Sequence, residues 1–473
     1  MSTSTNQRFQ RWDEVSEFLT TTSSFFYTGT KKVSHRDKLI IQDALLLWYL
    51  CTEDTLSSGE NPHPWDKNAW LNAITQCPVK DLVVTLKDGA MMLITSDIPS
   101  YDSFKRSLKV TIPTIGDIIS PMKGLIDRWL METDVSALTS LYSWFLFLSH
   151  LHLQDADDLK QEALEKYLLT ESSLKLDGFS VEEKNLIGRW FPRTLENAEF
   201  FCVNHVPGHG PGSTADCGRT MIDKYLGYRV DARLTMLRSR VGGFPLSPRI
   251  SSGLARCSKT IFVPKSVSSL RTISMEPASL MWHQKGVRNA LLLFISNKSK
   301  YLGRRLHFDD QSFNRDLAWE GSIDGSYATI DLSSASDTVS WPLVKEWFGH
   351  TCLYPWLLWT RSNLSRLPNG EVITLRKFAP MGSDLSFPIE SIIFSAVTEC
   401  AIMECGADPS RSRFVVYGDD IVVESEYAEQ VMYGLLTVAS LSMMTNHSQV
   451  HNHEDSLENH VVGTTSTASI WHQ

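Results

Sequence analysis

Two adjacent aspartates between two short β-prone runs constrain the fold of this chain more than any other feature. The tetrapeptide at 417–420 reads Tyr-Gly-Asp-Asp, and β-branched residues dominate 413–416 before it and 421–423 after it. This pattern predicts a hairpin with Asp419 and Asp420 at its turn. Carboxylates gathered at one point suit Mg²⁺, but the four letters also fit an ordinary Asp-rich turn.

A second acidic segment upstream favours the metal interpretation. Asp331 ends a β-prone run, and the Ser-rich stretch after it predicts a turn into a helix, with Ser333 or Ser334 as N-cap. Together with Asp419 and Asp420, Asp331 would supply three carboxylates from two strand ends. Two Mg²⁺ ions held in this way, or Mn²⁺ in their place, can clamp the attacking and leaving oxygens of a phosphoryl displacement. The alternative for Asp331 alone is a helix acid favoured by the dipole.

Length and composition predict a large soluble protein. A chain of 473 residues with 42% hydrophobic and 21% charged residues is typical of two or three globular domains. The eight cysteines are scattered without a C-x-x-C pair, which predicts no zinc site, no disulfide framework and a reducing cytosol. The polar N-terminus and the short apolar runs predict neither a signal peptide nor a membrane segment.

The charge of the chain is unevenly distributed. The net charge of −9 argues weakly against nucleic acid, yet residues 219–305 hold 17 Lys and Arg against 3 Asp and Glu. A basic segment in an acidic protein is the pattern of a phosphate-binding channel. A solvated basic face is the alternative.

Coarse secondary structure divides the chain into a helical first part and a mixed second part. Residues 1–190 are expected to be mainly helical, with a strand pair at 81–86 and 90–95 joined by Lys87-Asp88-Gly89. Further on we expect a strand, turn and strand over 256–273, a helix over 277–296, and alternating strands and helices over 322–423. The Gly- and Pro-rich loop at 207–212 could approach a phosphate or serve as a plain connector.

Two cations lie on the neighbouring short strands predicted before the aspartates. Lys265 follows Val-Pro, and Arg271 begins Arg-Thr-Ile-Ser-Met-Glu-Pro. Their guanidinium and ammonium groups could neutralise an incoming triphosphate. The alternative is a pair of surface cations on a hairpin.

Three further residues are candidates for contacts with a nucleotide sugar. Gly382 and Ser383 precede a helix-like segment at 385–400, where a glycine lets the backbone approach a ligand closely. Ser383 could bond to a sugar hydroxyl or act as an N-cap. Asp337 could sense a ribose 2′-OH through a hydrogen-bond network, or could be a first-turn helix acid.

In this order the motifs resemble viral RNA-dependent RNA polymerases, and they are most similar to the replicase catalytic subunit of levivirus-like positive-strand RNA phages. The resemblance covers roughly 208–436. It implies that Asp331, Asp419 and Asp420 are catalytic metal ligands. It also implies that the two cations hold nucleotide phosphates and that the three sugar candidates select ribose. Ser383 departs from the Asn usual in levivirus enzymes and looks more like ourmiavirus and narnavirus polymerases.

The resemblance implies an α+β right-hand polymerase. Its expected parts are a mostly helical N-terminal extension at 1–200, fingers at 201–320, a palm with the metal site at 321–436, and a thumb that is largely missing. The implied activity is template-directed RNA synthesis from NTPs for genome replication in the host cytoplasm, with RNA, NTPs and host translation factors as partners. The alternatives are a catalytically defective RNA-binding fragment and a reverse transcriptase. The second is disfavoured by Ser-Ser-Ala-Ser-Asp at 333–337, where a DNA-making enzyme needs a bulky steric gate.

The tail at 437–473 departs from the pattern of the family. Codons for 438–448 read one base earlier can spell Gly-Phe-Ser-Val-Asn-Asp-Asp-Lys-Ser-Phe, and those for 456–463 can spell Leu-Arg-Glu-Pro-Cys-Gly-Gly. We therefore expect an aberrant tail produced by a one-nucleotide frame change near 436–438. Its histidines would then form no metal site. A divergent natural tail is the alternative.

Overall fold

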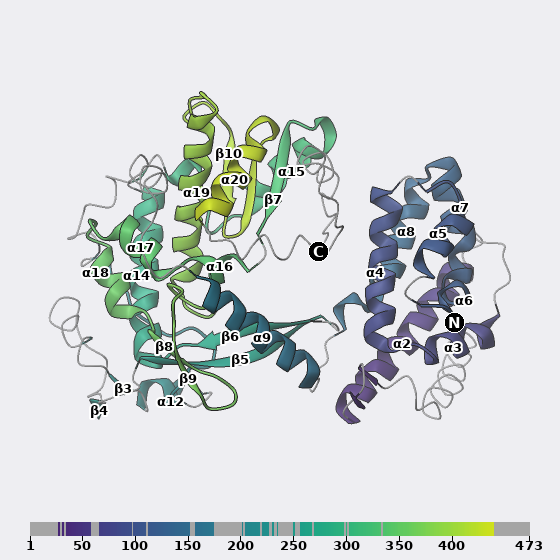
Figure 1. Ribbon diagram of the computed structural model, residues 1–473, viewed down its shortest axis with the longest axis horizontal. Coiled ribbons are helices and arrows are strands. Elements are labelled where there is room, and N and C mark those ends of the chain that lie inside the picture. The colour runs from purple at the N-terminus through teal and green to yellow at the C-terminus, as the bar shows by residue number, and fades with distance from the viewer. Residues whose placement is uncertain are drawn as a thin grey trace, which may run out of the picture. The chain divides into compact units, whose positions relative to one another are not determined.

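The computed structural model places the chain in two compact units (Figure 1). The first comprises Met1–Glu165 with Phe262–Arg271, and the second comprises Lys166–Ile261 with Thr272–Gln473. Each unit is described by itself. The residues that the structure describes are 27–28, 31–32, 35–57, 66–96, 98–109, 112–151, 157–174, 201, 204–217, 220–226, 229–230, 234, 249–250, 256–266, 269–297, 299, 302–332 and 334–438.

The first unit is mainly helical. Its core includes three tryptophans: the ring of Trp48 lies 5.1 Å from that of Trp70 and 4.7 Å from that of Trp144. The indole N–H of Trp48 donates to the Trp144 carbonyl at 3.1 Å, which satisfies its polar atom inside the core. The elements of the unit are β1 (Tyr27–Thr28), β2 (Lys31–Lys32), α2 (His35–Ser57), α3 (Lys67–Thr75), α4 (Val79–Thr95), α5 (Tyr101–Leu108), α6 (Ile115–Ile119), η1 (Ser120–Met122), α7 (Lys123–Glu132), α8 (Val135–Leu146) and η2 (Phe147–His150).

The strand pair predicted at 81–86 and 90–95 is wrong, because α4 is one continuous helix. Its buried residues recur at helical spacing, and this period outweighs the local Lys-Asp-Gly turn signal. Gly89 lies inside the helix, where a Cβ atom would come within 3.0 Å of the Phe145 ring. The glycine therefore permits close packing against α8 and makes no turn. The buried residues of α4 are Val79, Leu82, Val83, Thr85, Leu86, Gly89, Ala90 and Leu93.

The second unit is mixed α+β. The predicted strand, turn and strand over 256–273 and the predicted helix over 277–296 are confirmed as β5, β6 and α14. Its elements, some with residues of the first unit, are α9 (Asp157–Ser173), α12 (Met221–Leu226), β3 (Arg229–Val230), β4 (Arg249–Ile250), β5 (Cys257–Ser266), β6 (Ser269–Met275), α14 (Ala278–Asn297), η4 (Leu302–Arg304), α15 (Ser312–Asp324), β7 (Tyr327–Asp331), α16 (Ala335–Thr338), α17 (Trp341–Phe348), α18 (Tyr354–Thr360), β8 (Leu364–Arg366), β9 (Val372–Thr374), α19 (Ser386–Glu404), β10 (Phe414–Tyr417), β11 (Asp420–Glu424), η5 (Ser425–Tyr427) and α20 (Ala428–Val438).

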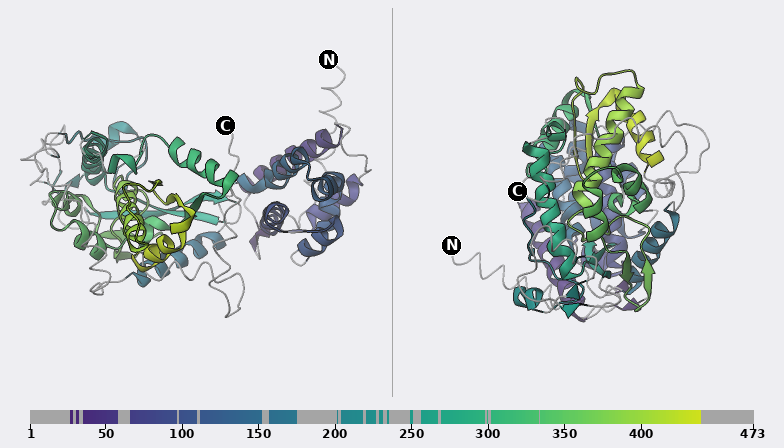
Figure 2. Two further views of the ribbon diagram at one scale, coloured as in Figure 1. Left: turned by 90° about the horizontal axis from the view of Figure 1, so that it is seen from above. Right: turned by 90° about the vertical axis from the view of Figure 1, so that its left-hand side faces the viewer.

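A three-stranded antiparallel sheet forms the centre of the second unit, in the order β10-β11-β7. Alternate side chains on these strands enter two different cores. Ile330 and Ile421 join the large core that α19 and α20 cover, whereas Tyr327 and Val422 pack under α15. Figures 1 and 2 show α15 and α19 on opposite faces of this sheet. A second sheet has the order β6-β5-β8-β9.

Helix α19 is the most apolar of the long helices in the described part of the chain. By length and composition it could cross a membrane, but 89% of its apolar window is buried inside the second unit. A helix that is hydrophobic all round and covered by protein is a core helix. It provides the rigid support on which the hairpin of β10 and β11 is placed. The predicted tail falls outside the described residues, apart from the end of α20.

Candidate active site

The backbone register brings the predicted aspartates together. Asp331 at the end of β7 is the direct partner of Asp420 at the start of β11, and Asp419 lies in the turn before it. Residues directly opposite in an antiparallel pair have Cβ atoms about 4.5–5.5 Å apart. Alternation along the strands puts Asp331 and Asp420 on the face that α15 covers, because Val422 points there. The predicted hairpin and its acidic tip are therefore present.

The geometry of the turn requires the glycine of the motif. Tyr417 pairs with Asp420, so Gly418 and Asp419 form a two-residue loop. Gly418 has a φ of +66°, and a Cβ atom on it would lie 2.5 Å from a Phe387 ring carbon. Glycine at the first central position is the preference of type II′ turns. Both the backbone conformation and the ring beneath it exclude a side chain here.

Helix α19 also holds the turn by a hydrogen bond. The N–H of Gly418 donates to Ser391 Oγ at 2.9 Å, and that hydroxyl donates to the Phe387 carbonyl at 2.7 Å. The Ser391 hydroxyl is thus satisfied on both sides. The turn that carries Asp419 is fixed to the most buried helix of the unit.

The start of α15 contacts Asp420 directly. Gln311 Nε2 donates to Asp420 Oδ2 at 3.4 Å, and Asn314 Nδ2 donates to the Asp420 carbonyl at 3.1 Å. Gln311 occupies the N-cap position of α15, at the positive end of the helix dipole. Gln311 and Asn314 lie within the stretch 208–436 that resembles the polymerase family. Their contacts with Asp420 span more than a hundred residues, so no local pattern revealed them.

Negative charge is concentrated at this end of the sheet. Burial raises the pKa of Asp420, and the neighbouring charges of Asp419 and Asp331 raise it further. The pKa of Glu390 on α19 is raised to about 8 by burial, then by Asp419 and Asp337. Carboxylates that interact in this way favour a bound cation, since it relieves their mutual repulsion.

The oxygen donors therefore fit a hard divalent cation. The fit rests on donor chemistry and backbone placement, because no three His, Cys, Asp or Glu side chains of the described residues already converge on one point. Asp331, Asp419 and Asp420 are all exposed, so an ion from solvent can reach them.

Asp337 has a more specific environment than a helix cap. It lies in the first turn of α16, and its Oδ1 accepts a hydrogen bond from Lys377 Nζ at 3.0 Å. Ser334 occupies the predicted N-cap position, but with a φ of +59° and no side-chain cap bond. Ser333, the other predicted cap, falls outside the described residues.

Gly382 and Ser383 lie in the loop before α19. Gly382 has a φ of +122°, and a Cβ atom there would lie 2.4 Å from the Ser274 carbonyl oxygen of β6. Glycine is therefore required for close packing against β6, whatever else approaches it. Ser383 Oγ accepts from the N–H of Leu385 at 3.3 Å, but the N-cap position of α19 is Leu385 itself.

Lys265 and Arg271 are exposed on β5 and β6. Both belong to the turn end of this hairpin, Phe262–Arg271, which groups with the first unit. The other six predicted site residues all belong to the second unit.

Part of the basic segment is structural. Lys224, Arg256 and Arg305 are buried and donate to backbone carbonyls. Lys224 Nζ, for example, bonds to the Gly210 carbonyl at 2.7 Å and so anchors the Gly- and Pro-rich loop. These cations stabilise the fold and cannot also neutralise phosphates.

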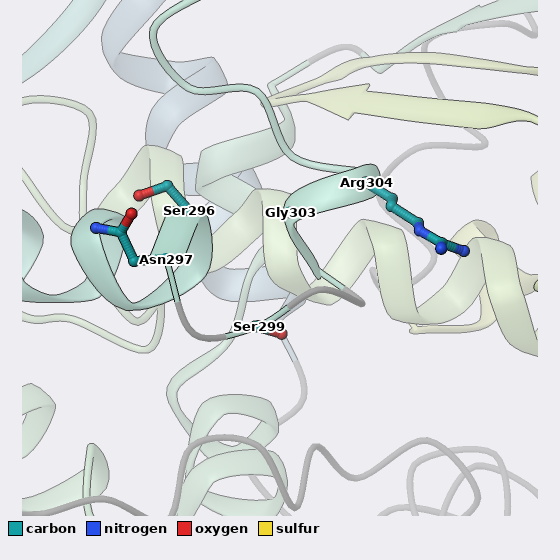
Figure 3. Close-up of a pocket in the computed structure, with 5 residues that line it drawn as sticks. All are labelled: Ser296, Asn297, Ser299, Gly303 and Arg304. Carbon is teal, nitrogen blue, oxygen red and sulfur yellow. The ribbon is translucent and has the colours of Figure 1, made fainter.

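A pocket of about 280 Å³ lies at the C-terminal end of α14 (Figure 3). In Figure 3, Arg304 points away from Ser296 and Asn297, so the polar groups do not converge. None of the predicted site residues lines it. The lining residues are Ser296, Asn297, Ser299, Gly303 and Arg304.

Comparison with known proteins shows what the segment that carries this site is similar to. The family described as "RNA replicase, beta-chain" matches residues 246–448, so the match begins later than 208 and ends twelve residues beyond 436. The chain is 39% identical over 173 residues to the RNA-directed RNA polymerase beta chain of Escherichia phage MS2, covering 37% of this chain and 30% of that protein. It is 35% identical over 181 residues to the RNA-directed RNA polymerase subunit beta of Enterobacteria phage SP, covering 37% and 29%.

The subunit beta of Escherichia virus Qbeta is 34% identical over 181 residues, covering 37% of this chain and 28% of that protein. The chain thus spans less than a third of the length of these curated relatives. The match contains the strands that carry all three aspartates, which confirms the resemblance drawn from the motifs. Residues 246–448 of this chain are similar to the RNA replicase beta-chain family.

Proposed function

We propose that this chain is an RNA-directed RNA polymerase of an RNA phage, which adds ribonucleotides to a growing RNA on an RNA template. The single observation that carries the proposal is the pairing of Asp331 with Asp420 across β7 and β11, with Asp419 in the adjoining turn. This arrangement lies within the segment that matches the replicase family.

The three aspartates have the role of holding divalent cations. Bound Mg²⁺ or Mn²⁺ would lower the pKa of the primer 3′-OH and offset the charge of the triphosphate. Asp331 and Asp420 face each other from rigid strands, so their oxygens are positioned before substrate arrives. Ser391 and Asn314 keep the backbone of the turn in place. The chain thereby contributes preorganised negative charge at the point where the cations are needed.

The remaining predicted residues bind the nucleotide. Asp337 recognises the ribose 2′-OH, and Gly382 and Ser383 lie on the loop that accommodates the sugar. Lys265 and Arg271 are exposed cations available for the triphosphate. The mixed α+β fold is then that of a right-hand polymerase, with the sheet of β7, β10 and β11 as its palm.

RNA template, RNA product and NTPs are the partners of this function, and host translation factors are a further proposed partner. The site of action is the interior of the host cell, in its cytoplasm. The frame change proposed for 437–473 stays a prediction. Sequencing the viral RNA across the Leu436 codon checks it.

Primer extension with the full chain tests the function. Wild-type protein should incorporate ribonucleotides, whereas Asp331→Asn and Asp419→Asn should lower incorporation by about a hundredfold or more, since each removes charge from a two-metal site. Both variants should still bind RNA. Asp316→Asn is the matched control, because this exposed aspartate of α15 pairs with Arg315.

Three outcomes would contradict the proposal. Wild-type turnover in both variants would end the metal-ligand role. Incorporation of deoxynucleotides in preference to ribonucleotides would indicate a reverse transcriptase. RNA binding by the wild-type chain without any incorporation would indicate a catalytically defective fragment.

A further inference from the structure

A buried lysine lies between two carboxylates that are far apart in the sequence. Lys377 Nζ is 3.0 Å from Asp337 Oδ1 and 3.2 Å from Glu171 Oε2, and its side chain is 0% exposed. Burial lowers its pKa, but Asp337, Tyr167 and Glu171 together more than offset this and hold the pKa above the ordinary value of lysine. Lys377 therefore stays protonated, and replacing its carboxylate partners by water would cost much free energy.

Two of these partners come from α9, which precedes the family match. Glu171 forms the ion pair, and the Tyr167 ring lies 3.9 Å from Lys377 Nζ. The match to the replicase family begins at residue 246, so neither residue is among the positions that it covers. Figure 1 shows α9 beside β6, where Tyr167 Oη lies 3.5 Å from Ser274 Oγ.

Glu171 has a second set of contacts besides the ion pair. Its Oε1 accepts the backbone N–H groups of Arg376 and Lys377, the latter at 3.2 Å. One buried carboxylate thus fixes both the backbone at 376–377 and the ammonium group of Lys377. The guanidinium of Arg376 adds a bond to the Ser172 carbonyl at 2.7 Å, at the end of the same helix.

The backbone segment 375–378, which we call the strap, is held from its carbonyl side as well. The buried guanidinium of Arg361 donates to the carbonyls of Leu375, Lys377 and Phe378 at 3.3, 2.9 and 3.0 Å. The strap therefore has charged groups of opposite sign on its two sides. It has little freedom to move without breaking one of these contacts.

The strap is hydrogen-bonded to the residues after α16, and it leads along the chain into the loop of Gly382. The N–H of Trp341 donates to the Arg376 carbonyl at 2.8 Å, and the N–H of Phe378 donates to the Val339 carbonyl at 2.7 Å. These bonds lie directly after the helix that carries Asp337. A displacement of the strap is thus transmitted to the residues that we assign to the sugar.

We propose that α9 is a positioning element for sugar selection, in which Glu171 and Tyr167 set the direction of the Asp337 carboxylate through Lys377. This inference rests on the role of Asp337 in the proposed function. With Glu171 in place, the ammonium group is shared between two carboxylates. Without the charge of Glu171, the ammonium group keeps Asp337 as its single ion-pair partner, is drawn toward it and competes with a ribose hydroxyl.

The substitution Glu171→Gln tests this mechanism with little disturbance. Glutamine keeps an oxygen that can accept the two strap amides, but it removes the charge. The measurement is the ratio of kcat/KM for ATP to that for 2′-dATP with the full chain, together with equilibrium binding of the two nucleotides. We expect this ratio to fall by about tenfold or more. A site that bonds the ribose 2′-OH discriminates against 2′-dATP only if the Asp337 carboxylate is available to make that bond.

Variants of Tyr167 test the role of α9 independently of Glu171. Tyr167→Leu removes the ring beside the ammonium group and should lower the ratio in the same direction. Tyr167→Phe keeps the ring and should stay close to wild type. Glu165→Gln is the matched control, since this exposed glutamate of α9 bonds to Gln161 at 2.7 Å. Thermal unfolding of each variant separates a loss of fold from a loss of selection.

The outcomes distinguish this inference from the function on which it rests. If Asp337→Ala lowers the ratio but folded Glu171→Gln and Tyr167→Leu leave it unchanged, the role of α9 is wrong and that of Asp337 stands. If Asp337→Ala also leaves the ratio unchanged, the sugar role of Asp337 is wrong and the inference fails with it. An equal fall in Glu165→Gln would overturn the inference as well. If the wild-type chain shows no turnover, the binding ratio decides in the same way.

Discussion

At the scale of single residues, the aspartates depend on neighbours that bond to the backbone of the turn, besides the bond of Gln311 to the Asp420 carboxylate. Asn314 holds the Asp420 carbonyl, and Ser391 holds the Gly418 amide. Both contacts are made by side chains on helices that cover opposite faces of the sheet. The position of the acidic turn is therefore fixed from both sides.

We predict that Asn314→Ala and Ser391→Ala each slow nucleotide addition without abolishing it. A buried backbone group left without its partner costs about 1–3 kcal/mol. If this cost appears in the transition state, kcat should fall by roughly tenfold to a hundredfold. Primer extension at saturating NTP measures it. Ser322→Ala, which removes an exposed bond to the Trp319 carbonyl, is the control. Unchanged kcat in both variants would show that the turn needs neither contact.

Lys265→Ala and Arg271→Ala should mainly weaken the use of NTP. Both cations are exposed, so screening by solvent is expected to limit each contact to about 1 kcal/mol. The KM for NTP should rise several-fold while RNA binding changes little. Extension rates at limiting NTP give the answer, with the exposed Lys345→Ala on α17 as control. Identical rates for both variants and wild type would remove them from the nucleotide site.

At the scale of elements, α14 packs closely against the loop that follows Phe201. His205 Nε2 lies 3.1 Å from His283 Nδ1, and a Cβ atom on Gly286 would lie 1.8 Å from the His205 ring. We predict that Gly286→Ala destabilises the second unit by about 1–3 kcal/mol, since overpacking displaces the ring. Urea unfolding measures this. Exposed Ser296→Ala on the same helix should have little effect, and equal stability of both variants would contradict the contact.

The same histidine pair predicts a dependence of stability on pH. Burial lowers the pKa of His205 to about 4, and burial together with His205 lowers that of His283 to about 3. The unfolded chain binds protons below about pH 6.5 that the folded chain excludes. Above that pH the pair does not lower the free energy of unfolding, because both histidines are neutral in the folded and the unfolded chain. The free energy of unfolding then falls as the pH drops from about 6.5 toward 4. Urea midpoints across this range should fall less in His283→Gln, whereas exposed His350→Gln should follow wild type.

At the scale of the whole molecule, the net charge conceals a basic segment of which only part can meet RNA. Of its 17 cations, at least Lys224, Arg256 and Arg305 bond to backbone carbonyls. The exposed cations of the described residues, such as Lys259, Lys265 and Arg271, should still make RNA binding depend on salt. We predict that affinity for a short RNA falls by about tenfold or more between low and physiological salt. Fluorescence anisotropy measures it, and a flat salt dependence would contradict a phosphate-binding surface.

The local motifs of the sequence determined most of the active sheet. The hairpin of β10 and β11 was predictable because Gly-Asp between β-branched runs is a short-range signal, and Asp331 because it ends such a run. The pairing of Asp331 with Asp420 followed from the order of motifs in a known family. The domain boundaries and the role of each site residue remain predictions.

Only the tertiary structure decided which residues support that sheet. Lys87-Asp88-Gly89 has the letters of a turn, yet α4 is a helix because its apolar period finds a core to pack against. Glu171 meets Lys377 across more than two hundred residues, and Gln311 meets Asp420 across more than a hundred. No local sequence pattern predicts such contacts, because their energy comes from burial and charge pairing that exist only once the chain has folded.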